Sequence, residues 1–129
     1  MMVSDGKDAY TIVLSNEALT VPCLADGTFA SGTFSSPYKY YTDVTVYKGA
    51  TKLLRDSTNG WGIDMPSGGT VALSAQSVDA YTFRFNITGF TGTASDLSGV
   101  GLIRIYMYTG AYLSATYTFN KTLSLSKAQ

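Results

Sequence analysis

The segment YTFRFNIT, residues 81–88, alternates apolar and polar side chains without interruption. Successive side chains of a β-strand point to opposite faces of the sheet, so one face of this segment is apolar and the other is polar. The apolar face holds Tyr81, Phe83, Phe85 and Ile87, and the polar face holds Thr82, Arg84, Asn86 and Thr88. The pattern predicts an antiparallel strand with one buried face.

Strand-like runs recur from one end of the chain to the other, and Gly, Pro and Asn turn signals separate them. No window of helical length shows apolar residues at the spacing of an amphipathic helix. Strands are predicted within residues 10–15, 19–23, 42–54 (two strands around a turn at 48–50), 61–65, 70–76, 81–88, 102–108 and 112–126. The glycine-rich segment 89–101 is interpreted as a long loop.

Two of these runs carry further detail. In the run 19–23, Pro22 has no N–H to donate to a ladder, which predicts a strand at the edge of a sheet. In the last run one face forms an apolar row of Leu113, Ala115, Tyr117 and Phe119, which Leu123 and Leu125 continue in phase past Lys121. This row predicts a long strand that faces the core.

The length of 129 residues fits one domain with a sizeable core. Seven to nine short strands with little helix are best buried in two antiparallel sheets packed face to face. We therefore predict an all-β sandwich, immunoglobulin-like or jelly-roll-like, with a partly closed barrel as the alternative. The domain is expected at residues 9–126, with linker-like ends at 1–8 and 127–129. One cysteine and one tryptophan exclude the Cys–Trp–Cys core of antibody domains.

The residue types of common active sites are scarce in this chain. It has no histidine, which removes Ser-His-Asp and Cys-His nucleophiles and the commonest metal ligand. Cys23 is the single cysteine and is expected to be a small buried hydrophobe. The acidic residues are scattered, and no pair of carboxylates or calcium-binding spacing stands out. We predict a protein that is not an enzyme and has no catalytic residue, metal site or cofactor.

Charge and hydropathy exclude further classes of function. Nine basic and nine acidic residues cancel and are dispersed, so we expect neither nucleic-acid nor membrane binding. The N-terminus lacks the apolar run of a secretory signal. The most apolar stretch, residues 100–108, is too short to span a bilayer and contains Arg104. The chain is expected to be soluble.

The segment SSPYKYYTDVTVYKG, residues 35–49, contains four tyrosines that could stack against a ligand. Strand phase places Tyr40 on the inward face with Val44 and Val46, and Tyr41 and Tyr47 on the other face. Trp61 lies in the Gly- and Asn-rich segment TNGWGID, and has two interpretations: a plug at one end of the core, which we favour, or an exposed platform. Trp61 and Tyr41 are the candidate ligand-binding residues, provided that the fold exposes both and brings them together.

Four segments of the chain resemble a known family: DAYTIVLSNEALTVPC, TDVTVYKGATKL, YTFRFNITG and LSATYTFNKTLSLSKA. They are similar to the β-rich module of minor structural, tail fibre and baseplate proteins from phages and prophages of Gram-positive bacteria. The markers are Leu14 to Glu17, the hairpin Val44 to Ala50, and the closing strand Phe119 to Leu125. The aromatic segment SPYKYY at 36–41 and residues 59–62 around Trp61 depart from the family pattern. The resemblance implies a virion tail or host-adhesion module and transfers no catalytic or binding residue.

Three functional hypotheses follow from the residues and the resemblance. The first is a non-catalytic spacer that positions neighbouring domains or subunits of a tail or baseplate assembly, located in the virion or encoded by a prophage in a bacterial cell. The second is a carbohydrate-binding module for host surface polysaccharide, because sugars stack on exposed aromatic rings and bind hydroxyls and amides. The third is an adhesion domain of a bacterial surface protein.

Overall fold

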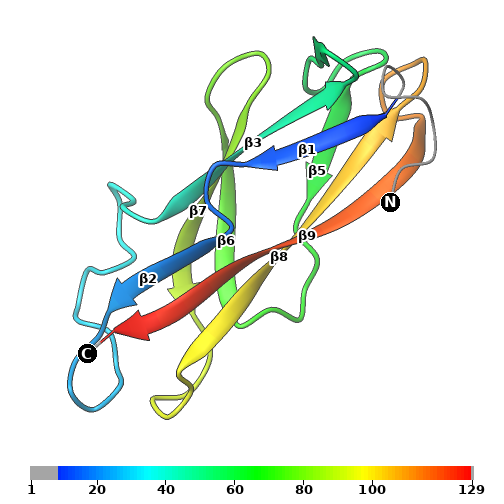
Figure 1. The fold of residues 1–129 in the computed structure, drawn as a ribbon. Helices are drawn as coiled ribbons and strands as arrows, with labels where there is room; N and C mark the ends of the chain where they lie inside the picture. Colours follow the sequence, from blue (N-terminus) through cyan, green and yellow to red (C-terminus); the bar gives the residue numbers. More distant parts are fainter. Residues whose placement is uncertain (1–8, 129) are drawn as a thin grey trace.

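Two β-sheets pack face to face in the computed structural model of the protein, which describes residues 9–128 (Figure 1). None of these described residues lies in a helix. The strands are β1 (Tyr10–Leu14), β2 (Ala18–Pro22), β3 (Tyr41–Lys48), β4 (Thr51–Lys52), β5 (Trp61–Asp64), β6 (Val71–Ser77), β7 (Phe83–Phe90), β8 (Ser98–Tyr108) and β9 (Ala115–Ala128). The prediction of an all-β sandwich is confirmed.

The strand order of the two sheets is that of the immunoglobulin fold. One sheet has the order β1-β3-β7-β6, with the short β4 also paired to β3, and the other has the order β2-β9-β8-β5. When the strands other than the short β4 are lettered in chain order as in immunoglobulin domains, the first sheet has the order A-B-E-D and the second sheet has the order A′-G-F-C. Strand β2 pairs in parallel with β9, whereas the other strand pairs are antiparallel. Of the predicted alternatives, the immunoglobulin-like sandwich is therefore the one that the topology matches.

The core lies between the two sheets, and its side chains come mainly from the strand faces that the alternation of apolar and polar residues predicts to point inward. In β3, Thr42, Val44 and Val46 are fully buried, as the strand phase predicts. In β7, Phe83, Phe85 and Ile87 of the predicted inward face are buried. Tyr81 precedes the strand and is exposed, and Asn86 of the predicted polar face is buried as well. The remaining large core side chains come from both sheets and include Val21, Trp61, Val71, Ile103, Ile105, Met107, Leu123 and Leu125.

The predicted loop at 89–101 is wrong at both ends. Strand β7 continues to Phe90 and β8 begins at Ser98, so the connection spans only residues 91–97. The glycines at positions 99 and 101 are strand residues where the sheets approach closely, because a Cβ on Gly101 would lie 2.8 Å from a methyl carbon of Leu73. Glycine inside a strand commonly marks such a close approach. Gly99 and Gly101 therefore serve the packing of the two sheets and are not turn residues.

Strand β9 also differs from its prediction at both ends. It begins at Ala115, because the chain leaves the strand at Leu113, which has φ 72° and is 69% exposed. Leu113, Ala115 and Tyr117 of the predicted inward row are exposed, whereas Leu123 and Leu125 are fully buried. At the other end β9 runs through Ala128, so residues 127–128 belong to the sheet and not to a linker. The predicted linker at 1–8 lies outside the described residues.

Candidate functional site

Trp61, the first candidate ligand-binding residue, is part of the core. It opens β5 and its side chain is 0% exposed. The indole Nε1 donates a hydrogen bond to the backbone oxygen of Leu53 at 3.2 Å, and the ring meets Phe83 edge-on with centroids 5.4 Å apart. A buried ring cannot stack on a sugar, so the interpretation as an exposed platform is wrong and the core plug is correct.

Tyr41, the second candidate, opens β3 on the outer face of the opposite sheet. The Arg84 guanidinium lies 3.9 Å from the centroid of its ring. Asp43 holds that guanidinium through two hydrogen bonds, at 2.7 and 3.1 Å, and this pairing raises the pKa of Arg84 further above its ordinary value. Arg84 therefore covers one face of the Tyr41 ring. Tyr41 lies on the outer face of its sheet and Trp61 lies in the core, so the fold does not present the two rings together.

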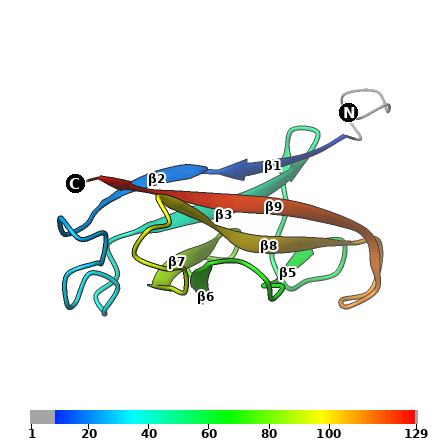
Figure 2. The same ribbon diagram turned by 90° about the horizontal axis from the view of Figure 1, so that it is seen from below.

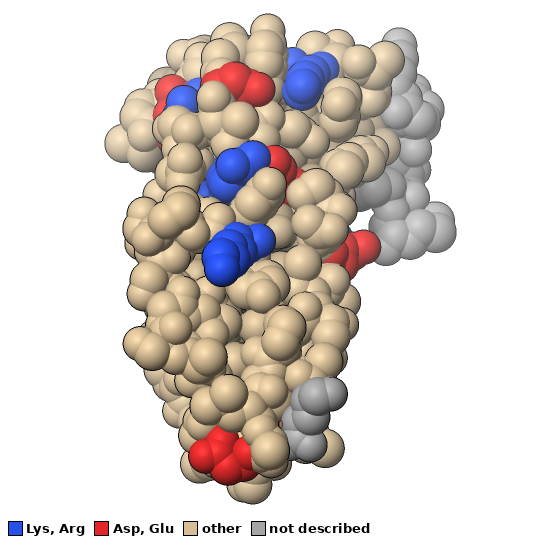
Figure 3. Space-filling model, turned by 90° about the vertical axis from the view of Figure 1, so that its left-hand side faces the viewer, with Lys and Arg blue, Asp and Glu red and all other residues tan. Residues whose placement is uncertain are grey.

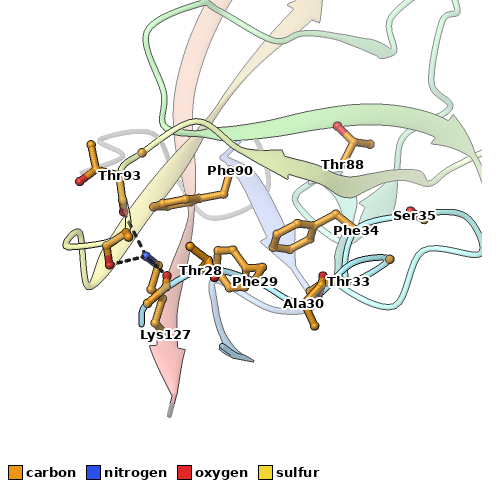
Figure 4. A pocket seen from close by; sticks show the side chains of 14 residues that line it. Thr28, Phe29, Ala30, Thr33, Phe34, Ser35, Thr88, Phe90, Thr93 and Lys127 are labelled. Atoms are coloured by element: carbon orange, nitrogen blue, oxygen red, sulfur yellow. Dashed lines mark hydrogen bonds between the residues drawn. The ribbon is translucent and has the colours of Figure 1, made fainter. Parts of the chain in front are cut away.

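A pocket lies elsewhere, where the β2–β3 and β7–β8 connections meet at one end of the sandwich (Figure 4). Its volume is about 410 Å³. Residues 27–35 form one wall, and residues 88–94 with Lys127 of β9 form the rest. We call this site the phenylalanine pocket, because the half-buried rings of Phe29, Phe34 and Phe90 line it.

The three rings of the phenylalanine pocket form a connected cluster. Phe29 meets Phe34 edge-on with centroids 4.8 Å apart, and meets Phe90 in the same way at 5.5 Å. Phe34 in turn contacts Tyr40 at 6.2 Å, which links the pocket to the sandwich. Edge-to-face pairs of this kind stabilise one arrangement of rings beyond the gain from burial. The apolar wall of the pocket is thus formed before any ligand arrives.

Lys127 ties the two connections of the phenylalanine pocket together. Its Nζ donates hydrogen bonds to the backbone oxygens of Gly27 at 2.7 Å, Thr93 at 3.1 Å and Ala94 at 3.3 Å (Figure 4). It also lies 4.8 Å from the ring centroid of Phe90. An ammonium group has three donors, and backbone oxygens occupy all of them. Lys127 therefore fixes the loops and does not offer an anion-binding group.

Hydroxyl groups surround the aromatic wall, and two of them have a fixed orientation. Thr28 Oγ1 donates to Asp26 Oδ1 at 2.6 Å, and Thr33 Oγ1 donates to the backbone oxygen of Ala30 at 2.7 Å. The remaining lone pairs of both hydroxyls can accept hydrogen bonds from a ligand. Hydrogen bonds from the Thr28 side chain and backbone N–H lower the pKa of Asp26, which keeps this turn anchored at neutral pH. The other hydroxyls that line the pocket belong to Ser35, Thr88 and Thr93.

The phenylalanine pocket combines apolar surface with neutral acceptors. Among the described residues that line it, Lys127 is the only charged one, and none is a histidine, cysteine or carboxylate. The lining therefore contains no nucleophile and base in contact. Aromatic surface beside a few oriented hydroxyls is suited to binding a small, neutral, polyhydroxylated molecule.

Sequence reasoning missed this pocket, although a signal was present. The triplet Gly-Thr-Phe occurs twice within eight residues, at 27–29 and 32–34. Both glycines have a positive φ, 89° and 85°. Gly27 closes the turn that begins at Leu24, Gly32 opens the turn that ends at Ser35, and the phenylalanine two residues after each glycine lies on the same wall. A repeated triplet in a segment of turn residues could have identified 24–35 as a built loop.

A smaller pocket of about 280 Å³ lies at the opposite end of the sandwich, between Tyr10, Lys48, Asn59 and Tyr108. The side-chain oxygen and the backbone N–H of Asn59 are already engaged there. Its side-chain oxygen accepts a hydrogen bond from the N–H of Gly110 at 2.7 Å, and its own N–H donates to the Gly110 oxygen at 2.8 Å. Asn59 therefore clamps two loops, and this pocket has less to offer a ligand.

Comparison with known proteins adds no identification, because no family model, curated protein or solved structure matches the chain. Within residues 9–128, no cluster of three potential metal-ligating side chains occurs. The described part of the chain also contains no helix of the length and apolarity needed to cross a membrane. On the face shown in Figure 3, basic and acidic side chains are few and interspersed.

Proposed function

We propose that the protein is a non-catalytic structural module that spaces neighbouring domains of a phage tail, baseplate or adhesion protein. The observation that carries this proposal is the path of the chain. Strand β1 begins at one end of the sandwich and β9 finishes at the opposite end, near the end of β2 (Figures 1 and 2). A polypeptide that entered at β1 and left after β9 would thus run the length of the domain, as an in-line spacer requires.

The pairing of the terminal strands supports a role under load. Strand β2 lies parallel to β9, with Ala18 opposite Ser124 and Pro22 opposite Ala128. Force applied at the two ends of the domain would pull these strands in opposite directions along their axes. Their hydrogen bonds would then bear the load together, whereas strands separated from one end break bonds one after another. This arrangement resists extension.

Substitutions in β2 test the load-bearing role. The N–H of Cys23 donates to Ala128, so by strand alternation the N–H of Leu19 also points to β9, while that of Thr20 points away. We expect Leu19→Pro to lower the unfolding force measured when single molecules are pulled through their ends, compared with Leu19→Ala. Thr20→Pro should have a smaller effect, because the natural Pro22 occupies the same phase of the strand. Equal forces for Leu19→Pro and Leu19→Ala would contradict the role.

A second candidate function is recognition of host surface polysaccharide, and the phenylalanine pocket is the observation that favours it. Three aromatic rings and five hydroxyl side chains line a pocket that Lys127, the one charged residue among those that line it, holds in shape. Sugars present apolar C–H faces and many hydroxyls, which are the complements of such a lining. In this candidate function the ligand-binding residues are those of the phenylalanine pocket and not Trp61 and Tyr41. A single module can both space its neighbouring domains and bind polysaccharide.

Binding to a panel of bacterial cell-wall polysaccharides tests the second candidate. We expect Thr88→Val, which removes one pocket hydroxyl while keeping the side-chain volume, to weaken binding about 5- to 10-fold, the effect of one lost hydrogen bond. Thr45→Val on the outer face of β3 is the matched control and should leave binding unchanged. Absence of binding to every polysaccharide, or equal effects of the two variants, would reject the pocket as a sugar site.

An adhesion domain on a bacterial surface is the third hypothesis, and the same in-line geometry would serve it. The location of the protein separates the two settings. A specific antibody should detect the chain in purified virions if it belongs to a tail assembly, and in a cell-wall fraction if it belongs to a bacterial surface protein.

A further inference from the structure

The longest strand of the sandwich, β9, is paired along only part of one edge. Strand β8 accompanies it from Ala115 to Ser126. On its other side β2 pairs with Ser124–Ala128 alone, and no further strand among residues 9–128 pairs with this edge. Residues 117–123 of β9 therefore form an open strand edge, about the length of an average strand.

The direction of the free backbone groups on this open edge follows from the bonds around it. The N–H of Ser124 donates to Glu17 and the oxygen of Ala128 accepts from Cys23, both on the β2 side. The N–H of Lys127 donates to Leu97, on the β8 side. Since successive residues of a strand alternate, even-numbered residues point away from β8. A bulge opposite Met107 and Tyr108 ends this phase, so the outward groups belong to Thr118, Asn120 and Thr122.

The side chains around the open edge favour strand pairing. The stretch YTFNKTL, residues 117–123, is rich in β-branched and aromatic residues, contains no proline and has one charge, on Lys121. By contrast, the short β2 carries Pro22, a common protection of exposed edges. Tyr117 beside the open edge is 50% exposed, and that surface becomes available for burial when another strand is added.

We propose that the open edge of β9 binds the same edge of a second copy of this chain, antiparallel and with the two-fold axis at Asn120. In this register Asn120 lies opposite its counterpart, and Thr118 lies opposite Thr122 of the other copy. All three outward-facing residues then exchange backbone hydrogen bonds in both copies, which extends one sheet across the dimer.

The chemistry of this register identifies a second copy as the occupant. Lys121 of one copy lies opposite Phe119 of the other in a non-hydrogen-bonded pair, where side chains are closest. The lysine therefore meets an aromatic ring and not another lysine, which is a favourable contact. The chain also has a net charge of zero, so two copies do not repel each other at long range. A two-fold interface of this kind is self-complementary.

Sedimentation of the full chain over a range of concentrations tests the proposal. The wild type should associate reversibly into a dimer. Thr118→Pro removes an outward N–H without removing a bond to β8, and it should weaken dimerisation about tenfold or more, because two hydrogen bonds are lost per dimer. Thr118→Val keeps the N–H and should dimerise like the wild type. A monomer at all concentrations, or a dimer that Thr118→Pro leaves intact, would overturn the proposal.

A cysteine placed on the axis tests the register. In a Cys23→Ser background, Asn120→Cys should form a disulfide-linked dimer on mild oxidation, because the two positions face each other at a distance that a disulfide can span. Thr122→Cys in the same background should crosslink far less, since it faces Thr118. Equal crosslinking of both variants would contradict the register. If the chain does not dimerise, the proposed load-bearing role is unaffected, because that role rests on the pairing of β2 with β9 and not on the open edge.

Discussion

Replacing Trp61 with alanine is expected to remove about 3–5 kcal/mol from the free energy of unfolding, the typical cost of truncating a fully buried aromatic side chain. The side chain is 0% exposed and packs against Phe83. Its loss would also leave the backbone oxygen of Leu53 without the indole donor. Because small domains have total stabilities of about 5–15 kcal/mol, this one change removes a substantial fraction of the free energy of unfolding.

Denaturant unfolding monitored by far-UV circular dichroism measures this effect. Trp61→Phe is the matched control, since it keeps an aromatic ring in the core and should cost clearly less than the alanine variant. Tyr41→Ala tests the other residue that the sequence singled out. It removes a surface contact with Arg84 and should cost only about 0.5–1 kcal/mol. A Trp61→Ala protein with the stability of the wild type would show that the tryptophan is not part of the core.

Gly27→Ala is expected to be the most damaging substitution in the phenylalanine pocket. Gly27 has φ 89°, a conformation that costs an L-residue roughly 1–2 kcal/mol. In addition, a Cβ at this position would collide with the backbone oxygen of Ala94, across the junction of the two connections. The loops would have to separate, and the hydrogen bonds from Lys127 to both of them would be weakened. We expect a total loss of about 3 kcal/mol or more.

Gly32→Ala provides a matched control within the same pocket. Gly32 has φ 85°, but a Cβ there would have no heavy atom within 4 Å. The alanine variant should therefore lose only the conformational cost of roughly 1–2 kcal/mol. Thermal unfolding of both variants, with amide exchange of residues 24–35 and 91–97, measures the difference. Equal losses for the two variants would mean that the contact between Gly27 and Ala94 does not hold the pocket together.

Alternation along the chain was sufficient to predict most of the sandwich. The inward rows of β3 and β7, the edge position of β2 and the final hairpin follow directly from side-chain phase and turn residues. The errors arose where one residue type has two uses. Glycine serves both turns and close packing of sheets, so local sequence predicts a loop at Gly99 and Gly101 although both are strand residues. Packing between sheets is a long-range property that local patterns do not encode.

The candidate site was harder to predict than the fold. Strand phase placed Tyr41 on the outer face correctly, but it could not show that Arg84 covers the ring, because that contact depends on the register between β3 and β7. The phenylalanine pocket depends on Lys127, which the sequence assigned to a linker and which bonds to residues about 30 and 100 positions away. The repeated Gly-Thr-Phe triplet is the one local sequence signal that we find for the phenylalanine pocket.

The most direct test of the structural role compares two directions of pulling on the same wild-type protein. Attachment at the two termini loads β2 against β9 in shear, whereas attachment at Cys23 and the C-terminus separates the same strands from one end, where Cys23 and Ala128 are hydrogen-bonded. A load-bearing spacer predicts a clearly higher rupture force for the first geometry than for the second. Equal forces in both geometries, or a lower force through the termini, would contradict it.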